Sequence, residues 1–348
     1  MSLITDATLD RIRQQIAARN NRLRDFAELY AQTTWDKVQL DVKTLSTEAL
    51  ATKYPRGTQL ICGYTLDDVT YDFPWVVLDN NRQCEWEDGS LHQGLWLGAR
   101  YGTIEEIQFD APETTNVNLA EETTALEGWY YWGVTGSTYT ALNLSTGDAI
   151  PTTYDSVKKC GINSVDVLRN GYNRWRDSGI RQWHNSAAGK GEWWTPQHLG
   201  DIAPSQLASR KGFMAGLDSD FLAVVHPIKV KTACNTITDG GETDTTIDTF
   251  FLQSVEEVYG SPQIAGVEGP YFPYWKDVLG IDAPSNSAND ARKIPKINNT
   301  SGSAVYLRLR SASRGHSYGA WYIGSGGNLG DYYHANGSYS SLPACVIS

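Results

Sequence analysis

Carboxylates at close spacing are the first candidates for chemistry in this chain. Asp218 and Asp220 lie two residues apart, which puts both on one face of a strand, where such a pair could hydrolyse a glycosidic bond. At the start of a helix the same residues cap the backbone instead. His184 has no nucleophile at a recognisable spacing, and the sequence has no GxSxG, HExxH, P-loop or GxGxxG motif. We therefore expect caps at the two aspartates, a structural or surface role for His184, and no enzyme.

A second group of carboxylates lies in residues 238–248. Asp239, Glu242, Asp244 and Asp248 supply the oxygen ligands that Ca²⁺ prefers, but their spacing does not match an EF-hand loop. We expect a solvated acidic loop, and neither a metal nor another cofactor.

Three arginines stand close to the end of the chain. Arg308 and Arg310 share one face of a predicted strand, opposite Leu307 and Leu309, and Arg314 follows them. These guanidinium groups could grip an anionic ligand. We favour a structural role, in which they bind loop carbonyls and carboxylates beneath a binding surface.

The segment that follows has the composition of an adaptable binding surface. Residues 315–341 read GHSYGAWYIGSGGNLGDYYHANGSYSS and include no Lys, Arg, Glu, Gln, Met or Pro. Tyr supplies rigid amphipathic contact area, while Ser, Gly and Asn supply hydrogen bonds and backbone freedom. The segment lies between two strand-like runs, residues 305–310 and 342–347. This arrangement favours recognition over catalysis.

The charge balance excludes several classes of partner. The 348 residues include 29 basic and 40 acidic side chains, for a net charge of -11, and no dense basic stripe occurs. Nucleic acid and anionic membrane surfaces are therefore unfavourable partners. We expect no membrane insertion, because no run of about 20 apolar residues occurs, and no signal peptide is visible. The five cysteines show no metal-ligand spacing, so we expect buried free thiols.

The first 53 residues are expected to form a helical attachment segment. Apolar residues at alternating spacings of three and four form a short heptad seam, with Arg19 in its one polar slot. The seam residues are Leu9, Ile12, Ile16, Leu23, Phe26 and Tyr30. Three heptads are marginal alone in water, so the seam either packs on its own chain or associates with copies of itself. We expect self-association.

Residues 54–152 are typical of a β-sandwich-like domain. Short apolar runs alternate with turn residues, and a polar, acidic stretch at 111–124 predicts an exposed loop. The runs are residues 59–63, 75–78 and 94–98, with turns expected at 79–81 and 88–89. The aromatic residues 128–132 predict either core packing or a carbohydrate-stacking face.

Residues 153–348 carry mixed helix and strand signals. Ser178, and Ser254 with Glu257, have N-cap spacing and predict two helices. Alternating apolar residues predict strands at 228–232 and 305–309. Further strands, joined by turns at 325–328 and 336–337, are expected at 320–323, 329–333 and 342–347. The fold class is therefore α+β: an N-terminal helix forming a short coiled coil, a β-rich middle domain, and a last domain whose helices precede an antiparallel terminal sheet.

A series of motifs from residue 170 to the end resembles an uncharacterised domain family common in gut bacteria and their phages. In order they are YNRW (172–175), SGIRQWHNS (178–186), WWTPQ (193–197), GFMAGLD (212–218), FLQSVEE (251–257), LRLRSASR (307–314) and PACVI (343–347). This half of the chain is similar to the C-type-lectin-like fold, in the branch related to formylglycine-generating enzymes. Residues 54–57 and 94–97 resemble the β-domain that precedes it in phage structural proteins. The resemblance implies a ligand-binding domain at 153–348 with a variable segment at 310–345.

Members of this fold serve as the variable proteins of diversity-generating retroelements, in which template adenines are randomised, mostly in AAY codons. An NNY codon cannot encode Lys, Glu, Gln, Met or Trp. Residues 315–341 lack the first four, and Trp321 lies where the family pattern at 319–322 would hold it fixed. The composition is consistent with such diversification; a Tyr/Gly/Ser-rich hairpin without a retroelement is the alternative. The lectin calcium motifs EPN and WND are absent, which argues against calcium-dependent sugar binding.

The resemblance implies a phage or prophage virion protein, a tail- or fibre-associated receptor-binding subunit made in the host cytoplasm. Its expected partners are a host bacterial surface protein or glycan, other virion proteins, and copies of itself, with a trimer favoured. The candidates for exposed ligand-binding side chains are Ser313, His316, Ser317, Tyr318, Tyr322, Asp331, Tyr332, His334, Asn336, Ser338 and Tyr339. The alternatives are a cell-wall-directed glycosidase or other enzyme on a lectin-like scaffold, and a purely structural virion decoration protein.

Overall fold

The computed structural model describes residues 34–112, 130–135, 138–143, 167, 170–197, 201–284 and 290–348. The predicted heptad seam, most of the predicted loop at 111–124, and Cys160 lie outside these residues. The side chains of the aromatic residues 128–132 also lie outside the described part of the structure, although the backbone of residues 130–132 belongs to a strand.

The described chain combines short helices with many strands. The α-helices are α2 (Trp35–Thr44), α3 (Thr47–Lys53), α6 (Gly179–His184), α7 (Ser219–Leu222), α8 (Val255–Tyr259) and α9 (Pro273–Asp277), with 3-10 turns η2 (Trp175–Asp177), η3 (Phe213–Gly216), η4 (Asp290–Arg292) and η5 (Ile297–Asn299). The first strands are β1 (Gln59–Leu66), β2 (Val69–Glu85), β3 (Leu91–Ala99), β4 (Ile107–Gln108), β5 (Tyr130–Thr135), β6 (Thr138–Asn143) and β7 (Ile228–Ala233). The later strands are β8 (Thr243–Asp248), β9 (Phe251–Leu252), β10 (Leu307–Ala312), β11 (Gly319–Ile323), β12 (Leu329–His334), β13 (Ser338–Ser341) and β14 (Pro343–Ile347).

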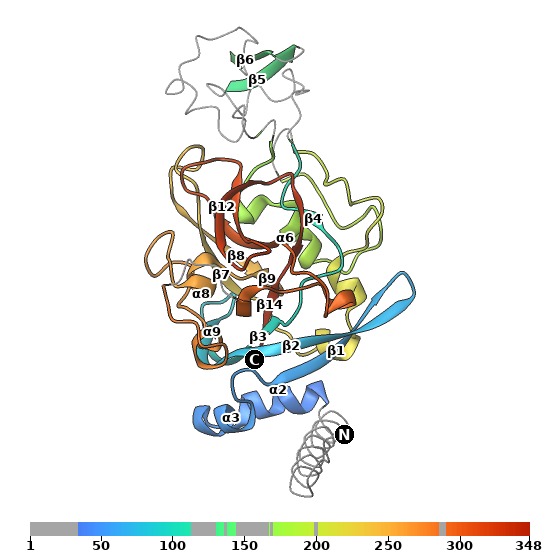
Figure 1. Ribbon diagram of the computed structural model, residues 1–348, viewed down its shortest axis with the longest axis vertical. Helices are drawn as coiled ribbons and strands as arrows, with labels where there is room; N and C mark the ends of the chain where they lie inside the picture. The colour runs from blue at the N-terminus through green and yellow to red at the C-terminus, as the bar shows by residue number, and fades with distance from the viewer. Residues whose placement is uncertain are drawn as a thin grey trace, which may run out of the picture.

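Two five-stranded sheets form the frame, with strand orders β1-β2-β3-β14-β9 and β12-β11-β10-β13-β4. β5 pairs with β6, and β7 with β8. The mixed helix and strand content and the mostly antiparallel pairing agree with the α+β expectation. Figure 1 shows α2 and α3 at one end of the molecule and β12 and β4 toward the other.

The terminal sheet departs from the expected all-antiparallel arrangement in two ways. β13 runs parallel to β10, with Leu307 opposite Ser340. β14 leaves this sheet and pairs with β3 and β9 in the other one. All five β14 residues are buried, so this strand is apolar on both faces and suits the interior of a sheet rather than an edge.

The two expected domains on either side of residue 152 share one sheet and one core among the described residues. β14 supplies the backbone partner of β3, with Cys345 opposite Leu97. Aromatic rings from both parts interleave: Trp75 lies 5.2 Å from Phe221 and 5.7 Å from Phe250 between ring centroids. Because aromatic rings bury large apolar areas, this contact packs the described residues of the two parts against each other.

Several local predictions are confirmed. Ser254 and Glu257 form a reciprocal capping box at the start of α8, and Ser178 accepts a hydrogen bond from the Arg181 N–H at the start of α6. The strands expected near 59–63, 75–78, 94–98, 228–232, 305–309, 320–323, 329–333 and 342–347 are present as β1, β2, β3, β7, β10, β11, β12 and β14. The four described cysteines are buried free thiols.

The turn expected at residues 79–81 is wrong, because β2 continues through it. Asp79 and Asn80 are buried, and the Asn80 side-chain amide donates to the Tyr54 carbonyl at 2.9 Å. The pairing of β2 with β3 shifts register on both sides of Asp79. Asp79 and Asn80 therefore lie in a β-bulged part of β2, where β2 has more residues than the facing part of β3, and not in a turn.

No described helix is long and apolar enough to cross a membrane.

Candidate binding surface

Four tyrosine rings gather on the terminal strands. Tyr306 lies 5.6 Å from Tyr322 and 5.6 Å from Tyr339 between ring centroids. Tyr333 meets Tyr322 at 5.3 Å and Tyr339 at 4.9 Å, both edge to face. Tyr306 and Tyr333 are 41% and 43% exposed, and the other two rings are partly buried. This tyrosine cluster offers ligands an aromatic surface in which the rings brace one another.

A second aromatic group adjoins the tyrosine cluster. The Tyr318 ring stands edge-on to His316 at 5.6 Å and to His334 at 5.2 Å. His334 also lies 6.4 Å from Tyr333, which connects the two groups. Of these residues, His334 is exposed, and His316 and Tyr318 are partly buried. Together the groups carry aromatic rings and imidazole nitrogens on one contiguous surface.

Arg308 lies buried beneath this surface. Its guanidinium donates to the carbonyls of Ala320 (3.2 Å), Tyr333 (3.1 Å), His334 (2.9 Å) and Gly337 (3.1 Å). The same group lies 4.7 Å from the centre of the Tyr339 ring. Burial lowers the pKa of Arg308 to about 10, which still leaves it charged at neutral pH. The predicted structural role of this arginine is confirmed.

Arg310 and Arg314 also have the structural role that the sequence favours. Arg310 donates to the Leu252 carbonyl at 2.7 Å and to the carboxylate of Glu257 at 2.5 Å. Arg314 donates to the carbonyls of Cys234 and Gly241. All three arginines therefore tie strands and loops together.

The turn that leads into β11 is held by one buried asparagine. The Asn173 side-chain amide donates to the carbonyls of His316 (2.6 Å), Gly319 (2.7 Å) and Ser313 (3.3 Å). Its backbone N–H donates to the Ser317 carbonyl. The expectation that Ser313 and Ser317 are exposed is wrong: they are 4% and 1% exposed, because Asn173 draws this turn onto the protein.

The other predicted site residues lie along the same strands. Tyr318, Tyr322, His334 and Tyr339 are in the two aromatic groups, with His316 beside them. Asn336 accepts at its carbonyl from Gln108, and the Ser338 hydroxyl accepts from Gln206 at 2.7 Å. The side chains of Asp331 and Tyr332 lie outside the described part of the structure.

Tyr306 and Tyr333 are surface residues that the sequence did not single out. Ala320 pairs with Tyr333 while Tyr322 pairs with Gly330, so β12 holds one residue more than β11 between these pairs. Such a bulge changes which side chains share a face. Simple alternation along β12 therefore could not predict that Tyr333 lies on this surface. Tyr306 could have been predicted, because it lies two residues before Arg308 and residues two apart in a strand share a face.

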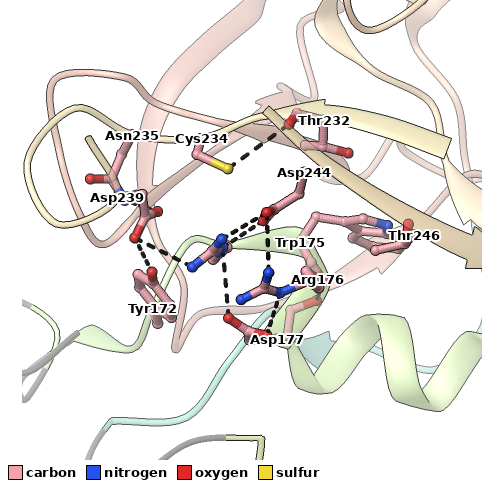
Figure 2. A network of polar contacts seen from close by, with 12 residues as sticks. Tyr172, Trp175, Arg176, Asp177, Thr232, Cys234, Asn235, Asp239, Asp244 and Thr246 are labelled. Atoms are coloured by element: carbon pink, nitrogen blue, oxygen red, sulfur yellow. Dashed lines mark hydrogen bonds and ion pairs between the residues drawn. The ribbon is translucent and has the colours of Figure 1, made fainter. Parts of the chain in front are cut away.

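The expectation of a solvated acidic loop at 238–248 holds for Glu242, which is exposed, but not for the three aspartates. Figure 2 shows Asp239 and Asp244 in contact with other polar side chains. Asp244 and Asp248 are 7% and 0% exposed. Asp244 receives two hydrogen bonds from Arg174, at 2.5 and 2.7 Å, and Asp248 receives one from Arg181 at 2.6 Å. Burial pushes the pKa of Asp244 up, but bonding to Arg174 outweighs it, so the pKa is lowered. We call Arg174, Arg176 and Arg181 with Asp177, Asp244 and Asp248 the salt-bridge network.

Asp239 belongs to a neighbouring buried group. Its carboxylate accepts hydrogen bonds from the Tyr172 hydroxyl and from Asn235. Burial raises its pKa. Asn235 in turn donates to the Asn173 side chain at 2.9 Å, so this carboxylate supports the turn beneath the binding surface. Within the described residues, no group of three or more His, Cys, Asp or Glu side chains could hold a metal ion.

The residues considered for catalysis have structural partners. His184 is fully buried; its Nδ1 lies 2.9 Å from the Ile180 carbonyl and its Nε2 lies 3.0 Å from the Ser341 hydroxyl. A carbonyl only accepts, so Nδ1 carries the proton and Ser341 donates to Nε2. Asp218 occupies the cap position of α7, but its carboxylate accepts from the Gly63 N–H at 2.6 Å. The structural role of His184 is confirmed. The expected capping by Asp218 is wrong, because its side chain makes no cap hydrogen bond and binds β1 instead.

The chain belongs to a family of domains of unknown function, DUF6273, whose sequence pattern matches residues 154–348. The matched region begins after β6 and includes the salt-bridge network and the binding surface. No curated protein matches the chain. No solved structure matches it either.

Proposed function

We propose that this protein is a receptor-binding subunit of a phage virion, and that residues 315–341 are its ligand-binding segment. In this proposal the last domain is C-type-lectin-like, and residues 1–53 attach the subunit and associate it into a trimer. The ligand is a protein or glycan on the host bacterial surface. The tyrosine cluster with Tyr318 and His334 makes the principal contact.

One observation carries the proposal: the rest of the protein holds most of this segment through its backbone carbonyls, and binds hydroxyl side chains near its end, at Ser338, Ser340 and Ser341. Arg308 binds four of them, and Asn173 binds three along residues 313–319. Tyr259 donates to the Gly327 carbonyl and Gln108 to the Asn336 carbonyl. A carbonyl oxygen is present whatever side chain its residue carries. The fold can therefore keep its shape while the displayed side chains change, which is what a diversified recognition surface requires.

The chemistry of the displayed side chains supports recognition. Tyrosine at the centre of an interface contributes a large share of binding energy, and it orders at low entropic cost. A trimer would present three such surfaces, so weak single-site binding would become strong on a cell that carries many receptors. Diversification by a retroelement remains part of the proposal. A nearby reverse transcriptase gene and a template copy of residues 310–347 that differs at adenines would support it.

The decisive experiment measures binding of the full-length protein to bacterial cells. We expect Tyr306→Ser with Tyr333→Ser to weaken adsorption at least about thirtyfold, the equivalent of about 2 kcal/mol for hot-spot tyrosines. The matched control is Tyr71→Ser, the same change at a partly buried tyrosine of β2 on the other sheet. Thermal unfolding of each variant separates lost binding from lost structure. Unchanged adsorption by a folded double variant, on strains that the wild type binds, would overturn the proposal.

A further inference from the structure

A cavity of about 210 Å³ lies apart from the terminal surface. Residues from β2, β3, β7, β9, α8 and β10 line it, together with the loop at 267–269. No member of the tyrosine cluster belongs to its lining. One water needs only about 10–15 Å³ of such volume, so the cavity has room for a small organic molecule.

Arg82 provides a cation in the cavity wall, and one of its guanidinium nitrogens makes no hydrogen bond to the described part of the chain. Its guanidinium stacks on Trp96 at 4.1 Å and on Phe272 at 5.1 Å, so the side chain is braced. Nη2 reaches Glu257 only at 3.5 Å. Nη1 is buried and has no hydrogen-bond partner among the described residues. A guanidinium held in one orientation with unused N–H groups is suited to a carboxylate, because its fork matches the two oxygens.

Gly269 keeps the space beside Arg82 open. Its φ of +103° lies in a region that side-chain-bearing residues rarely adopt. A Cβ at this position would stand 2.3 Å from Nη2 of Arg82 and 3.0 Å from Oε1 of Glu257. Any other residue here would push the guanidinium out of place.

The cavity carries a surplus of positive charge in a protein of net charge -11. The cations of its lining are Arg82, Lys229, Lys231 and Arg310, and its carboxylates are Glu85, Glu257 and Glu268. Glu85 pairs with Lys229 at 2.8 Å and Glu257 with Arg310 at 2.5 Å. Among the remaining charges of the lining, Arg82 and Lys231 outnumber the one carboxylate Glu268. Burial raises the pKa of Glu268 to about 7, so below neutral pH the surplus grows by one charge.

Part of the lining is apolar. Ile228 and Val230 come from β7, Phe251 from β9 and Val267 from the adjoining loop. A strongly hydrated dianion would lose its water against these walls without enough cations to replace it. A singly charged molecule with a short apolar body fits both the charge and the lining.

We propose that this cavity binds a small organic monocarboxylate, with its carboxylate on Arg82 and its apolar body against Ile228, Val230, Phe251 and Val267. The site is separate from the host-binding surface, and it does not depend on the function proposed for that surface. Occupancy would also stabilise the fold, because the cavity joins β2, from the first part of the chain, to β7 and β10 of the family domain.

The test is calorimetric titration of the full-length protein with sodium benzoate, sodium butyrate and inorganic phosphate. We expect saturable binding of at least one carboxylate in preference to phosphate. Arg82→Gln should weaken that binding at least about tenfold. The matched control, Arg100→Gln, makes the same change at another ring-stacked arginine, 5.2 Å from Tyr101 and outside this cavity, and should leave binding intact. Failure of both carboxylates to bind at millimolar concentration, or equal loss in both variants, would overturn the proposal.

A pH series gives a second readout that does not require removing Arg82. Carboxylate binding should be tighter at pH 6 than at pH 8, because protonated Glu268 no longer opposes the ligand. Glu268→Gln should remove most of that difference while still binding. A folded Glu268→Gln protein with an unchanged pH profile would contradict the proposed geometry. Tyr306→Ser with Tyr333→Ser should leave benzoate binding untouched, which separates this site from the host-binding surface.

Discussion

The salt-bridge network and the terminal segment are fixed in place by opposite means. In the network, side chains bind side chains: Arg174 with Asp244, and Arg181 with Asp248. In the terminal segment, side chains that lie beneath it bind its main-chain carbonyls, and Arg308 alone binds four of them. The two regions are joined through Asp239, which lies 4.0 Å from Arg174 of the network. Asn235 and Asn173 link Asp239 to the turn at 313–319.

This difference decides how much each region tolerates a change of side chain. A network of complementary charges fails when one partner is replaced, because the other charge stays buried and unpaired. A segment held by its carbonyls loses only the contacts of the replaced side chain itself. We therefore expect the salt-bridge network to tolerate few substitutions and the terminal segment to tolerate many. Mutations in the two regions can be compared directly.

The largest effect is expected from Asp248→Ala in the network. This residue is fully buried and accepts from Arg181 (2.6 Å), Trp175 (2.9 Å) and Thr246 (2.6 Å). Removing it leaves the partly buried Arg181 guanidinium without its carboxylate and the Trp175 indole N–H without its acceptor, so the free energy of unfolding should fall by about 3–5 kcal/mol. Chemical denaturation measures this loss. The control is Asp220→Ala, a change of an exposed carboxylate in the same half of the chain, expected within about 0.5 kcal/mol.

Arg308→Met is expected to have the next largest effect, and it tests whether the terminal segment depends on its base. Methionine keeps an apolar side chain of similar length but cannot donate to the four carbonyls that Arg308 binds. The free energy of unfolding should therefore fall by about 3 kcal/mol. Amide hydrogen exchange should rise first in residues 319–341. Exchange that rises equally across β1 to β3 would show that Arg308 supports the whole fold rather than the segment.

His184 joins the two regions, since it lies in α6 and accepts from Ser341 at the end of the terminal segment. Burial lowers its pKa to about 4 from an ordinary value of 6.5. The unfolded state therefore binds more protons between these values. The contribution of His184 is complete above pH 6.5 and is lost as pH falls toward 4, by up to about 3 kcal/mol.

His184→Gln tests this pH dependence, because its amide can donate to Ile180 and accept from Ser341 without titrating. The difference in unfolding free energy between wild type and variant should change steadily from pH 6.5 to 4. Comparing the two proteins removes the opposite contribution of Glu268, whose raised pKa makes stability fall as pH rises. A pH-independent difference would show that His184 is not held neutral by burial.

Local sequence signals predicted most of the strands and caps because their causes are local. The capping box of Ser254 and Glu257 depends on residues three apart, and β7 on alternation over a few residues. The position of β14 could not be predicted in this way, since its partners β3 and β9 lie far away in the sequence. The apparent turn at Asn80 failed for the same reason: its bond to the Tyr54 carbonyl is a tertiary contact.

The site was predicted as a segment but not residue by residue. Composition singled out residues 315–341 as the candidate segment, whose ligand-binding role stays a prediction, and strand position predicted the structural role of Arg308. Burial of Ser313 and Ser317 depends on Asn173, about 140 residues earlier, which no local pattern contains. The exposure of Tyr333 depends on a bulge in β12 that shifts the alternation. The burial of Asp244 and Asp248 was not predicted because their arginine partners come from a separate segment at 174–181.

The smallest loss of stability is expected from side-chain changes in the terminal segment, at residues whose carbonyls Arg308 binds. Tyr333→Ser together with His334→Ser keeps both carbonyls and removes only ring contacts, which are partly exposed. The free energy of unfolding should fall by about 1 kcal/mol or less. Denaturation of this double variant beside Arg308→Met gives the comparison directly. A double variant as unstable as Arg308→Met would mean that the rings, and not the carbonyls, fix the segment, and the surface would then be unable to vary without cost to the fold.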